Sequence, residues 1–197
     1  VLSAVRAKND FSNLYIATSD DRSDNHLAQV FENYDFEVYR GSLDNVLSRF
    51  IEIASLNNLT NGDCIIRLTG DNLLVDSSLL MELKEFYIGK KLEYFSSQPD
   101  PIENFNWPKG LSAEFINVGA LRESYKADLS KENIEHVTTF IRKKTTHKYS
   151  GIDCIDLKNN FKGLSFSIDT LEEFHFMKKQ FEGCSLKDNY KIILKES

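Results

Sequence analysis

Two aspartates in this 197-residue chain each follow a short apolar run, which is where chemistry is often found in an α/β protein. Asp71 comes directly after Gly70, and Asp169 ends the predicted strand Leu164–Ile168. Burying an unpaired carboxylate is costly, and a magnesium ion would compensate because it takes hard oxygen ligands. Two such aspartates could converge on one metal ion. The alternative is that each caps the segment that follows it, and spacing alone favours the cap.

A second candidate is the tripeptide Arg40-Gly41-Ser42, which precedes a predicted amphipathic helix that Ser42 would cap. A guanidinium, a flexible backbone and a hydroxyl at a helix N-terminus suit an anion, but a plain turn with a surface arginine fits equally well. His136 lies within a predicted helix, where a lone histidine is more often a packing residue than a catalyst. The chain has no Ser-His-Asp order, zinc-ligand spacing or Walker loop, and no glycine precedes Gly41.

Hydrophobic periodicity places these residues on alternating strands and helices. The predicted strands cover 14–19, 36–39, 63–68, 94–96, 111–117, 148–157 and 164–168, and the predicted helices cover 26–34, 42–54, 77–86, 118–125, 132–144 and 171–181. This alternation is typical of βαβ units and a mainly parallel sheet, in which ligands bind beyond the carboxyl ends of the strands.

The segment 93–117 interrupts this rhythm. All three prolines and the single tryptophan, Trp107, lie between Gln98 and Gly110. A loop of this length is usually functional. We therefore predict a single domain over residues 1–197, with 93–117 as an excursion that covers the substrate or forms a dimer contact.

Composition excludes several classes of function. A net charge of −6 argues against a general nucleic-acid binder, whose affinity comes largely from a basic surface. Cys64, Cys154 and Cys184 are odd in number and lack metal-ligand spacing, which indicates a reducing cytoplasm rather than a disulfide framework. No apolar run approaches the ~20 residues that span a bilayer, so no membrane insertion is expected. Val1–Lys8 begins like the middle of a helix, so we expect a fragment.

Five motifs occur in order along the chain. They are Arg40-Gly41-Ser42, Arg67-Leu68-Thr69-Gly70-Asp71, Pro108-x-Gly110-Leu111 with Glu114, Glu135-His136-Val137-Thr138, and Ser167-Ile168-Asp169-Thr170. Together they resemble the cytidylyltransferase family that includes the 3-deoxy-manno-octulosonate and acylneuraminate cytidylyltransferases. The resemblance is strongest to the branch named for spore coat polysaccharide biosynthesis protein F.

The resemblance implies a three-layer α/β/α Rossmann-like nucleotidyltransferase fold that is incomplete at its N-terminus. It implies that a sugar or sugar-acid hydroxyl attacks the α-phosphate of a nucleoside triphosphate, usually CTP, and releases pyrophosphate, with Mg²⁺ as cofactor, in bacterial surface-polysaccharide synthesis. Homodimers are common among such enzymes. By resemblance the catalytic metal ligands are Asp71 and Asp169, the nucleotide-binding residues are Arg40, Ser42, Thr69 and Gly70, and the sugar side is lined by Glu114 and His136.

The chain departs from the family pattern at several positions. We expect Val1 to fall inside the helix that follows the family's opening strand and phosphate loop, so that this sequence either starts after those elements or comes from a homologue that has lost them. Asn72-Leu73 replaces a usual Cys-Pro pair, Ser112 replaces an aspartate, and Thr139 replaces a proline. Two alternatives therefore stay open: a glycosyltransferase that uses a nucleotide-sugar donor, and a non-catalytic homologue that lacks the phosphate loop.

Overall fold

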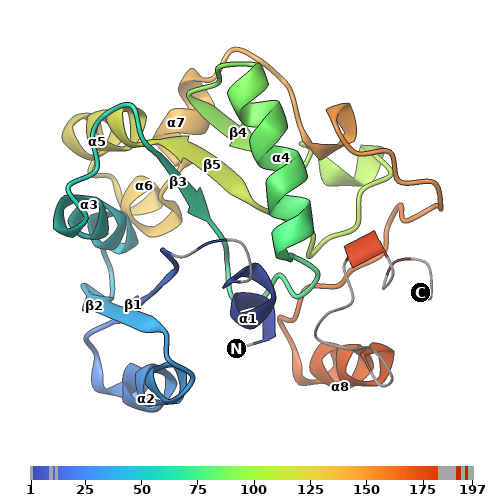
Figure 1. The fold of residues 1–197 in the computed structure, drawn as a ribbon, viewed down its shortest axis with the longest axis horizontal. Coiled ribbons are helices and arrows are strands. Elements are labelled where there is room, and N and C mark those ends of the chain that lie inside the picture. Colours follow the sequence, from blue (N-terminus) through green and yellow to red (C-terminus); the bar gives the residue numbers. More distant parts are fainter. Residues whose placement is uncertain (1, 9–10, 12, 182–189, 192–193, 195–197) are drawn as a thin grey trace. The chain divides into compact units, whose positions relative to one another are not determined.

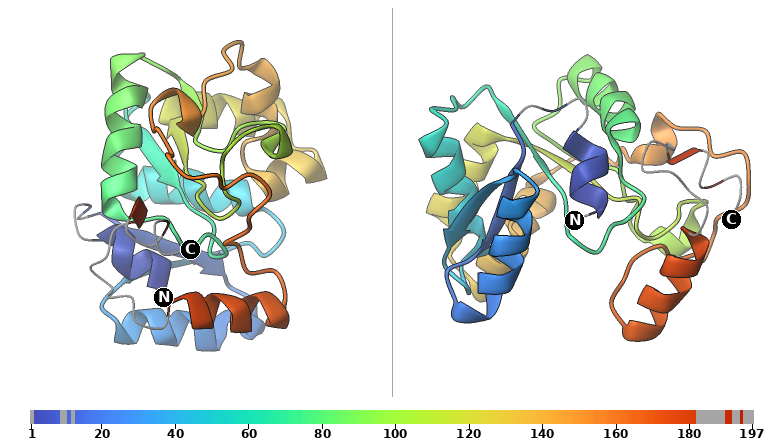
Figure 2. Two further views of the ribbon diagram at one scale, coloured as in Figure 1. Left: turned by 90° about the vertical axis from the view of Figure 1, so that its right-hand side faces the viewer. Right: turned by 60° about the horizontal axis from the view of Figure 1, so that its bottom comes forward.

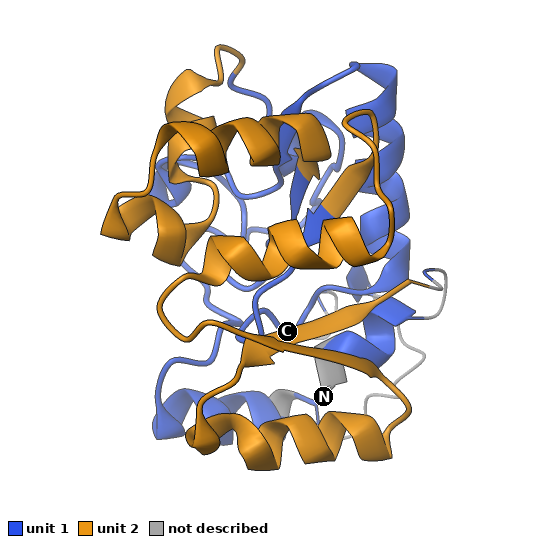
Figure 3. Ribbon diagram, turned by 90° about the vertical axis from the view of Figure 1, so that its left-hand side faces the viewer, with its two compact units in different colours: residues 1–12, 66–115, 148–197 blue, residues 13–65, 116–147 orange. Residues whose placement is uncertain are grey.

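The computed structural model describes residues 2–8, 11, 13–181, 190–191 and 194, so Val1 and Cys184 lie outside the described residues. Contacts between residues group the chain into two compact units. Unit 1 comprises residues 1–12, 66–115 and 148–197, and unit 2 comprises residues 13–65 and 116–147 (Figure 3). The single domain expected over 1–197 stays a prediction.

Helices and strands alternate along most of the chain, as expected (Figure 1). In order they are α1 (Leu2–Lys8), β1 (Tyr15–Ser19), η1 (Arg22–Asp24), α2 (Asn25–Asn33), β2 (Glu37–Gly41), α3 (Val46–Leu56), β3 (Cys64–Arg67), α4 (Ser77–Gly89), β4 (Tyr94–Ser96), η2 (Ile102–Asn104), β5 (Glu114–Asn117), α5 (Val118–Ala127), α6 (Lys131–His136), α7 (Thr139–Lys144), η3 (Gly151–Asp153) and α8 (Leu171–Gln180). Within the described residues the strands form a two-stranded sheet, β1-β2, and a three-stranded sheet in the order β3-β5-β4. The α/β class predicted from the sequence is confirmed.

Unit 2 is built on the parallel pair β1 and β2, whose register runs from Tyr15 opposite Glu37 to Ser19 opposite Gly41. Helices α2 and α3 pack on this pair (Figures 1 and 2). The ring of Phe31 on α2 meets that of Phe36 edge-on at 5.6 Å. This packing fixes the carboxyl ends of both strands, where the segments after Ser19 and Gly41 begin.

Unit 1 has an aromatic core beneath α4. The rings of Phe86 and Phe95 lie 5.4 Å apart, and Phe115 lies 5.5 Å from Tyr87 and 6.0 Å from Phe95. Trp107 joins the buried core of this unit, and its indole Nε1 donates to the Leu111 carbonyl at 3.0 Å.

The aromatic side chains of the 93–117 segment therefore face inward. Tyr94, Phe95 and Trp107 are all buried. The Trp107 ring packs so closely on Gly151 that a Cβ added there would lie 2.1 Å from it. These three side chains hold the segment in the core of unit 1, and its role as a substrate cover or dimer contact stays a prediction.

The helix predicted over 132–144 is divided at Val137, and this part of the prediction is wrong. Val137 has φ 69° and ψ −46°, and the Thr138 amide donates to the His136 carbonyl at 2.7 Å. This is a γ-turn, a strained conformation for a β-branched residue. Asn133 holds it, since its side-chain oxygen accepts from the Phe140 amide at 2.9 Å.

Two predicted strands, 148–157 and 164–168, are also wrong. Ser150 and Asp153 form a capping box that starts the 3₁₀ turn η3 instead of a strand. Residues 164–168 alternate in polarity like a strand, but Ser165 bridges only Lys109 and Ser167 bridges only Asn72. Because each bridge joins a different segment, no continuous ladder forms.

Candidate active site

Asp71 lies in a turn that follows β3. The Asn72 amide donates to the Thr69 carbonyl at 3.2 Å, and the Asn72 side chain bonds the Thr69 hydroxyl. The Asp71 carboxylate accepts a hydrogen bond from the Ser167 hydroxyl at 2.9 Å, and its carbonyl accepts from the Ile168 amide at 3.3 Å. Asp71 is thus held against the segment that leads directly into Asp169.

Asp169 precedes α8 without capping it, so the cap interpretation is wrong for this residue. Thr170 is the N-cap: its side chain accepts from the Glu173 amide, and Glu173 completes the capping box. The Glu173 carboxylate accepts from the Asp169 and Thr170 amides at 2.7 and 2.8 Å. The Asp169 carboxylate is therefore left for another role, and it accepts from Lys109 Nζ at 2.6 Å.

Lys109 is the residue that links the two aspartates electrostatically, and sequence reasoning assigned it no role. Its pKa is raised, first by the hydrogen bond to Asp169 and then by the negative charges of Asp169, Glu173 and Asp71. Asp169 is thus the hydrogen-bonded partner of the ammonium group, and Glu173 and Asp71 add to its negative surroundings. The only signal in the sequence is that Lys109 occupies the unassigned position between Pro108 and Gly110.

The backbone around Lys109 is fixed from both sides. The Lys109 amide donates to the Leu164 carbonyl at 3.0 Å, and its carbonyl accepts from the Phe166 amide at 2.7 Å. Gly110 has φ 93°, and a Cβ there would lie 2.4 Å from the Phe166 carbonyl carbon. Only glycine allows this approach, so the motif glycine sets the path of the lysine before it.

Glu114, predicted on the sugar side, is buried in the sheet of β3, β5 and β4. Its carboxylate pairs with Arg67 and accepts from the Tyr94 hydroxyl at 2.5 Å. Glu114 thus ties the end of β3, and with it the start of the Thr69–Asp71 turn, to the neighbouring strands. A direct contact between Glu114 and a sugar stays a prediction.

The donor set of unit 1 fits magnesium. Asp71 and Asp169 offer hard oxygen ligands, and the Lys109 ammonium group is bonded to Asp169. The described residues contain no group of three or more His, Cys, Asp or Glu side chains arranged for a metal ion. Mg²⁺ is usually bound by one or two carboxylates, and its remaining ligands are substrate phosphates and water.

Arg40 and Ser42, predicted to bind the nucleotide, belong to unit 2. The Arg40 guanidinium donates to the Ser19 carbonyl at 2.9 Å and to the Asp21 carbonyl at 2.8 Å, so it links the segment after β1 to β2. The prediction that Ser42 caps α3 is wrong. Its hydroxyl accepts from the Asn45 amide at 3.0 Å, and Asn45 is the N-cap.

His136 is exposed at the end of α6, also in unit 2, directly before the γ-turn at Val137. The buried Asn133 fixes this corner through its bonds to Ser124 and to the Asp128 carbonyl at 2.8 Å. The structure therefore brings Thr69, Gly70, Asp71 and Asp169 together within unit 1. The roles predicted for Arg40, Ser42 and His136 stay predictions.

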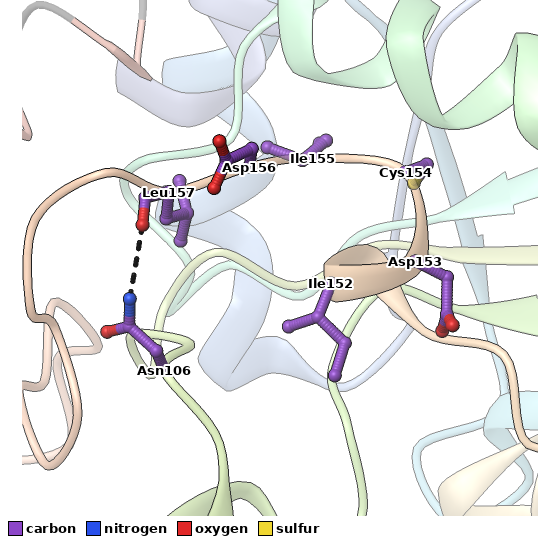
Figure 4. A pocket seen from close by; sticks show the side chains of 7 residues that line it. All are labelled: Asn106, Ile152, Asp153, Cys154, Ile155, Asp156 and Leu157. Atoms are coloured by element: carbon purple, nitrogen blue, oxygen red, sulfur yellow. Dashed lines mark hydrogen bonds between the residues drawn. The ribbon is translucent and has the colours of Figure 1, made fainter.

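A separate pocket in unit 1 lacks the features of a catalytic site. Its volume is about 490 Å³, and it is lined by Asn106 and residues 152–157 (Figure 4). The Asn106 side chain donates to the Leu157 carbonyl at 3.2 Å, which shapes one wall. Burial raises the pKa of the Cys154 thiol to about 11, so this cysteine is not an activated nucleophile.

No helix in the described part of the chain combines the length and apolar character needed to cross a membrane. The fold itself is that of a nucleotidyltransferase. A cytidylyltransferase from Leptospira borgpetersenii superimposes with a TM-score of 0.82 and 20% sequence identity, over 98% of this chain and 80% of that chain.

The sequence comparisons define the family. A spore coat polysaccharide biosynthesis protein, SpsF of Bacillus subtilis, is 30% identical over 176 residues, 88% of this chain and 68% of the relative. An uncharacterised protein of Methanocaldococcus jannaschii is 26% identical over 175 residues, with the same shares covered. The family model for cytidylyltransferases matches residues 1–194. The chain belongs to the cytidylyltransferase family, whose members are nucleotidyltransferases that use CTP, and the resemblance inferred from the five motifs is confirmed.

Proposed function

We propose that this protein transfers the cytidylyl group of CTP to a hydroxyl of a sugar or sugar acid, releasing pyrophosphate and forming a nucleotide sugar for surface-polysaccharide synthesis. The observation that supports the proposal is that Asp71 is hydrogen-bonded to Ser167 and Ile168, directly before Asp169 in the chain, so that both aspartates belong to one site in unit 1. The polysaccharide role is supported by the name of the Bacillus subtilis relative.

The proposal assigns Mg²⁺ to Asp71 and Asp169. These two carboxylates would hold a divalent ion, which would supply charge neutralisation for the triphosphate. Ser167 aims the Asp71 carboxylate through its hydroxyl hydrogen bond. Glu173 fixes the backbone of Asp169 from the first turn of α8. The contribution of these residues is therefore positioning and electrostatic preorganisation, as in other phosphoryl transfers.

The remaining residues have supporting roles in the proposal. Thr69 and Gly70 shape the turn that presents Asp71, and Gly70 has open space around it, which leaves room for a phosphate. Arg40 and Ser42 are proposed to contact the nucleotide, and His136 the sugar. A homodimer and a cytoplasmic location are part of the same proposal and follow from the family and from the cysteine pattern.

Pyrophosphate release from CTP, measured with Mg²⁺ and a panel of sugars and sugar acids, tests this function. Asp71→Asn and Asp169→Asn are each expected to lower turnover at least about 100-fold, because each removes a charged group that acts on the triphosphate. The exposed Asp156→Asn is the matched control and should retain full turnover. Circular dichroism of each variant checks that the fold is intact. Full activity in either folded variant would overturn the metal assignment.

A further inference from the structure

We infer that Lys109 is the internal counter-ion of Asp169, so that a divalent cation must displace its ammonium group from the Asp169 carboxylate in order to bind there. This inference rests on the proposed function, because it concerns the same two carboxylates. Lys109 then neutralises part of the negative charge of this site and lowers the affinity of the site for a divalent ion.

The backbone of Lys109 is held in place by neighbouring segments. Lys109 cannot move away as a unit, because its amide and carbonyl are both bonded to residues 164–166. The next residue, Gly110, packs directly against the Phe166 backbone. The lysine side chain therefore starts from a fixed point, and from there its Nζ reaches the Asp169 carboxylate at 2.6 Å. Only the side chain is free to exchange its partner.

The surroundings of the Lys109 ammonium group are acidic. Asp71, Asp169 and Glu173 all act on the Lys109 ammonium. Carboxylates that act on the same ammonium group also repel one another, and a positive charge beside them lowers that cost. A divalent ion provides the same compensation more strongly, so it competes with the ammonium for Asp169.

The ion pair between Lys109 and Asp169 is accessible to solvent. The side chains of Lys109 and Asp169 are 48% and 54% exposed, respectively. An ion pair this exposed is weak and can exchange its partners in water. The Asp71 carboxylate, by contrast, accepts its hydrogen bond from the Ser167 hydroxyl and not from Lys109. Exchange is therefore expected at Asp169, with Asp71 as the constant ligand.

The test is the affinity for Mn²⁺ alone, without nucleotide, measured by electron paramagnetic resonance of the free ion at low ionic strength. Lys109→Met is expected to bind Mn²⁺ about threefold to tenfold more tightly than the unmodified protein, because Asp169 is released and a like charge is removed. Lys109→Arg keeps the charge and should stay near the unmodified value. Lys158→Met, the same charge change at an exposed lysine elsewhere in unit 1, should have little effect.

The outcomes separate this inference from the proposed function. If Lys109→Met binds Mn²⁺ no more tightly than Lys158→Met, while Asp71→Asn and Asp169→Asn weaken binding, the metal site stands and the counter-ion role of Lys109 is overturned. If Asp71→Asn and Asp169→Asn bind Mn²⁺ as well as the unmodified protein, the metal assignment fails as well. A gain in Lys109→Met that disappears when Asp169→Asn is added supports the exchange at Asp169.

Discussion

Asp76 is the residue through which the N-terminal helix, α4 and Tyr190 are joined in unit 1. Its carboxylate caps α4 by accepting from the Leu79 amide at 2.9 Å. It forms an ion pair with Arg6 at 3.2 Å, with side-chain exposures of 7% and 1%, and it accepts from the Tyr190 amide at 2.5 Å. We predict that this buried cluster makes Asp76 one of the most sensitive positions for stability.

The magnitude follows from these contacts. Taking one partner from a buried ion pair costs about 3–5 kcal/mol, and losing an N-cap costs about 1 kcal/mol more. Asp76→Ala should therefore lower the free energy of unfolding by about 4–6 kcal/mol, a large share of the total for a typical domain. Asp76→Asn keeps a good capping side chain and should lose about 1 kcal/mol less. With an ordinary urea dependence of about 2 kcal/mol/M, the Asp76→Ala midpoint should fall by about 2–3 M.

The assay is urea unfolding followed by the fluorescence of Trp107, the only tryptophan, which is buried in the same unit. Asp156→Asn is an exposed control in this unit and should change stability by less than about 0.5 kcal/mol. Adding Arg6→Met to Asp76→Asn should recover part of the loss, because the buried charge is then removed. The reasoning is refuted if Asp76→Asn unfolds at the unmodified midpoint, or if the two substitutions simply add.

Two further predictions concern backbone strain and pH. Gly110→Ala should lower the free energy of unfolding by about 2–5 kcal/mol, because Gly110 has a left-handed conformation and the new Cβ would clash with Phe166. Gly163 has φ 79° but open space around it, so Gly163→Ala should cost only about 1–2 kcal/mol. Equal urea midpoints for the two variants would show that the contact with Phe166 does not matter. The Ser19 hydroxyl bond helps to lower the pKa of Asp24 from 3.8 to about 2. Because the folded pKa is depressed, the stabilisation is present above the unfolded pKa and is lost as the pH falls through this window. Asp24→Asn should therefore flatten the fall in urea midpoint between pH 5 and about pH 2, and an unchanged slope would count against it.

Helices were predictable from the sequence where their apolar spacing is regular and a cap is present. The helix expected over 171–181 is α8, and the helix expected over 118–125 is α5. The start of α3 was misplaced by three residues, because a serine and an asparagine lie close together and both are good caps. Local sequence does not decide between them, since the choice depends on how the preceding strand ends.

The candidate site was predictable in part. The rule that ligands gather at strand ends drew attention to Asp71 and Asp169, and the structure brings both into the environment of Lys109. The strand expected before Asp169 is absent from the described structure, yet the bridge between Asn72 and Ser167 produces the same juxtaposition. Lys109 gave no signal of its own, because a single lysine in a proline-rich loop looks like a surface residue until tertiary contacts are known.

Calorimetric titration of CTP into the full-length protein, with and without Mg²⁺, tests the central claim most directly. The account predicts that CTP binds in the presence of Mg²⁺, that UTP, ATP and GTP bind more weakly, and that Asp71→Asn and Asp169→Asn lose the dependence on the metal. CTP binding of equal strength with and without Mg²⁺, or no binding of any triphosphate by the folded protein, would contradict it.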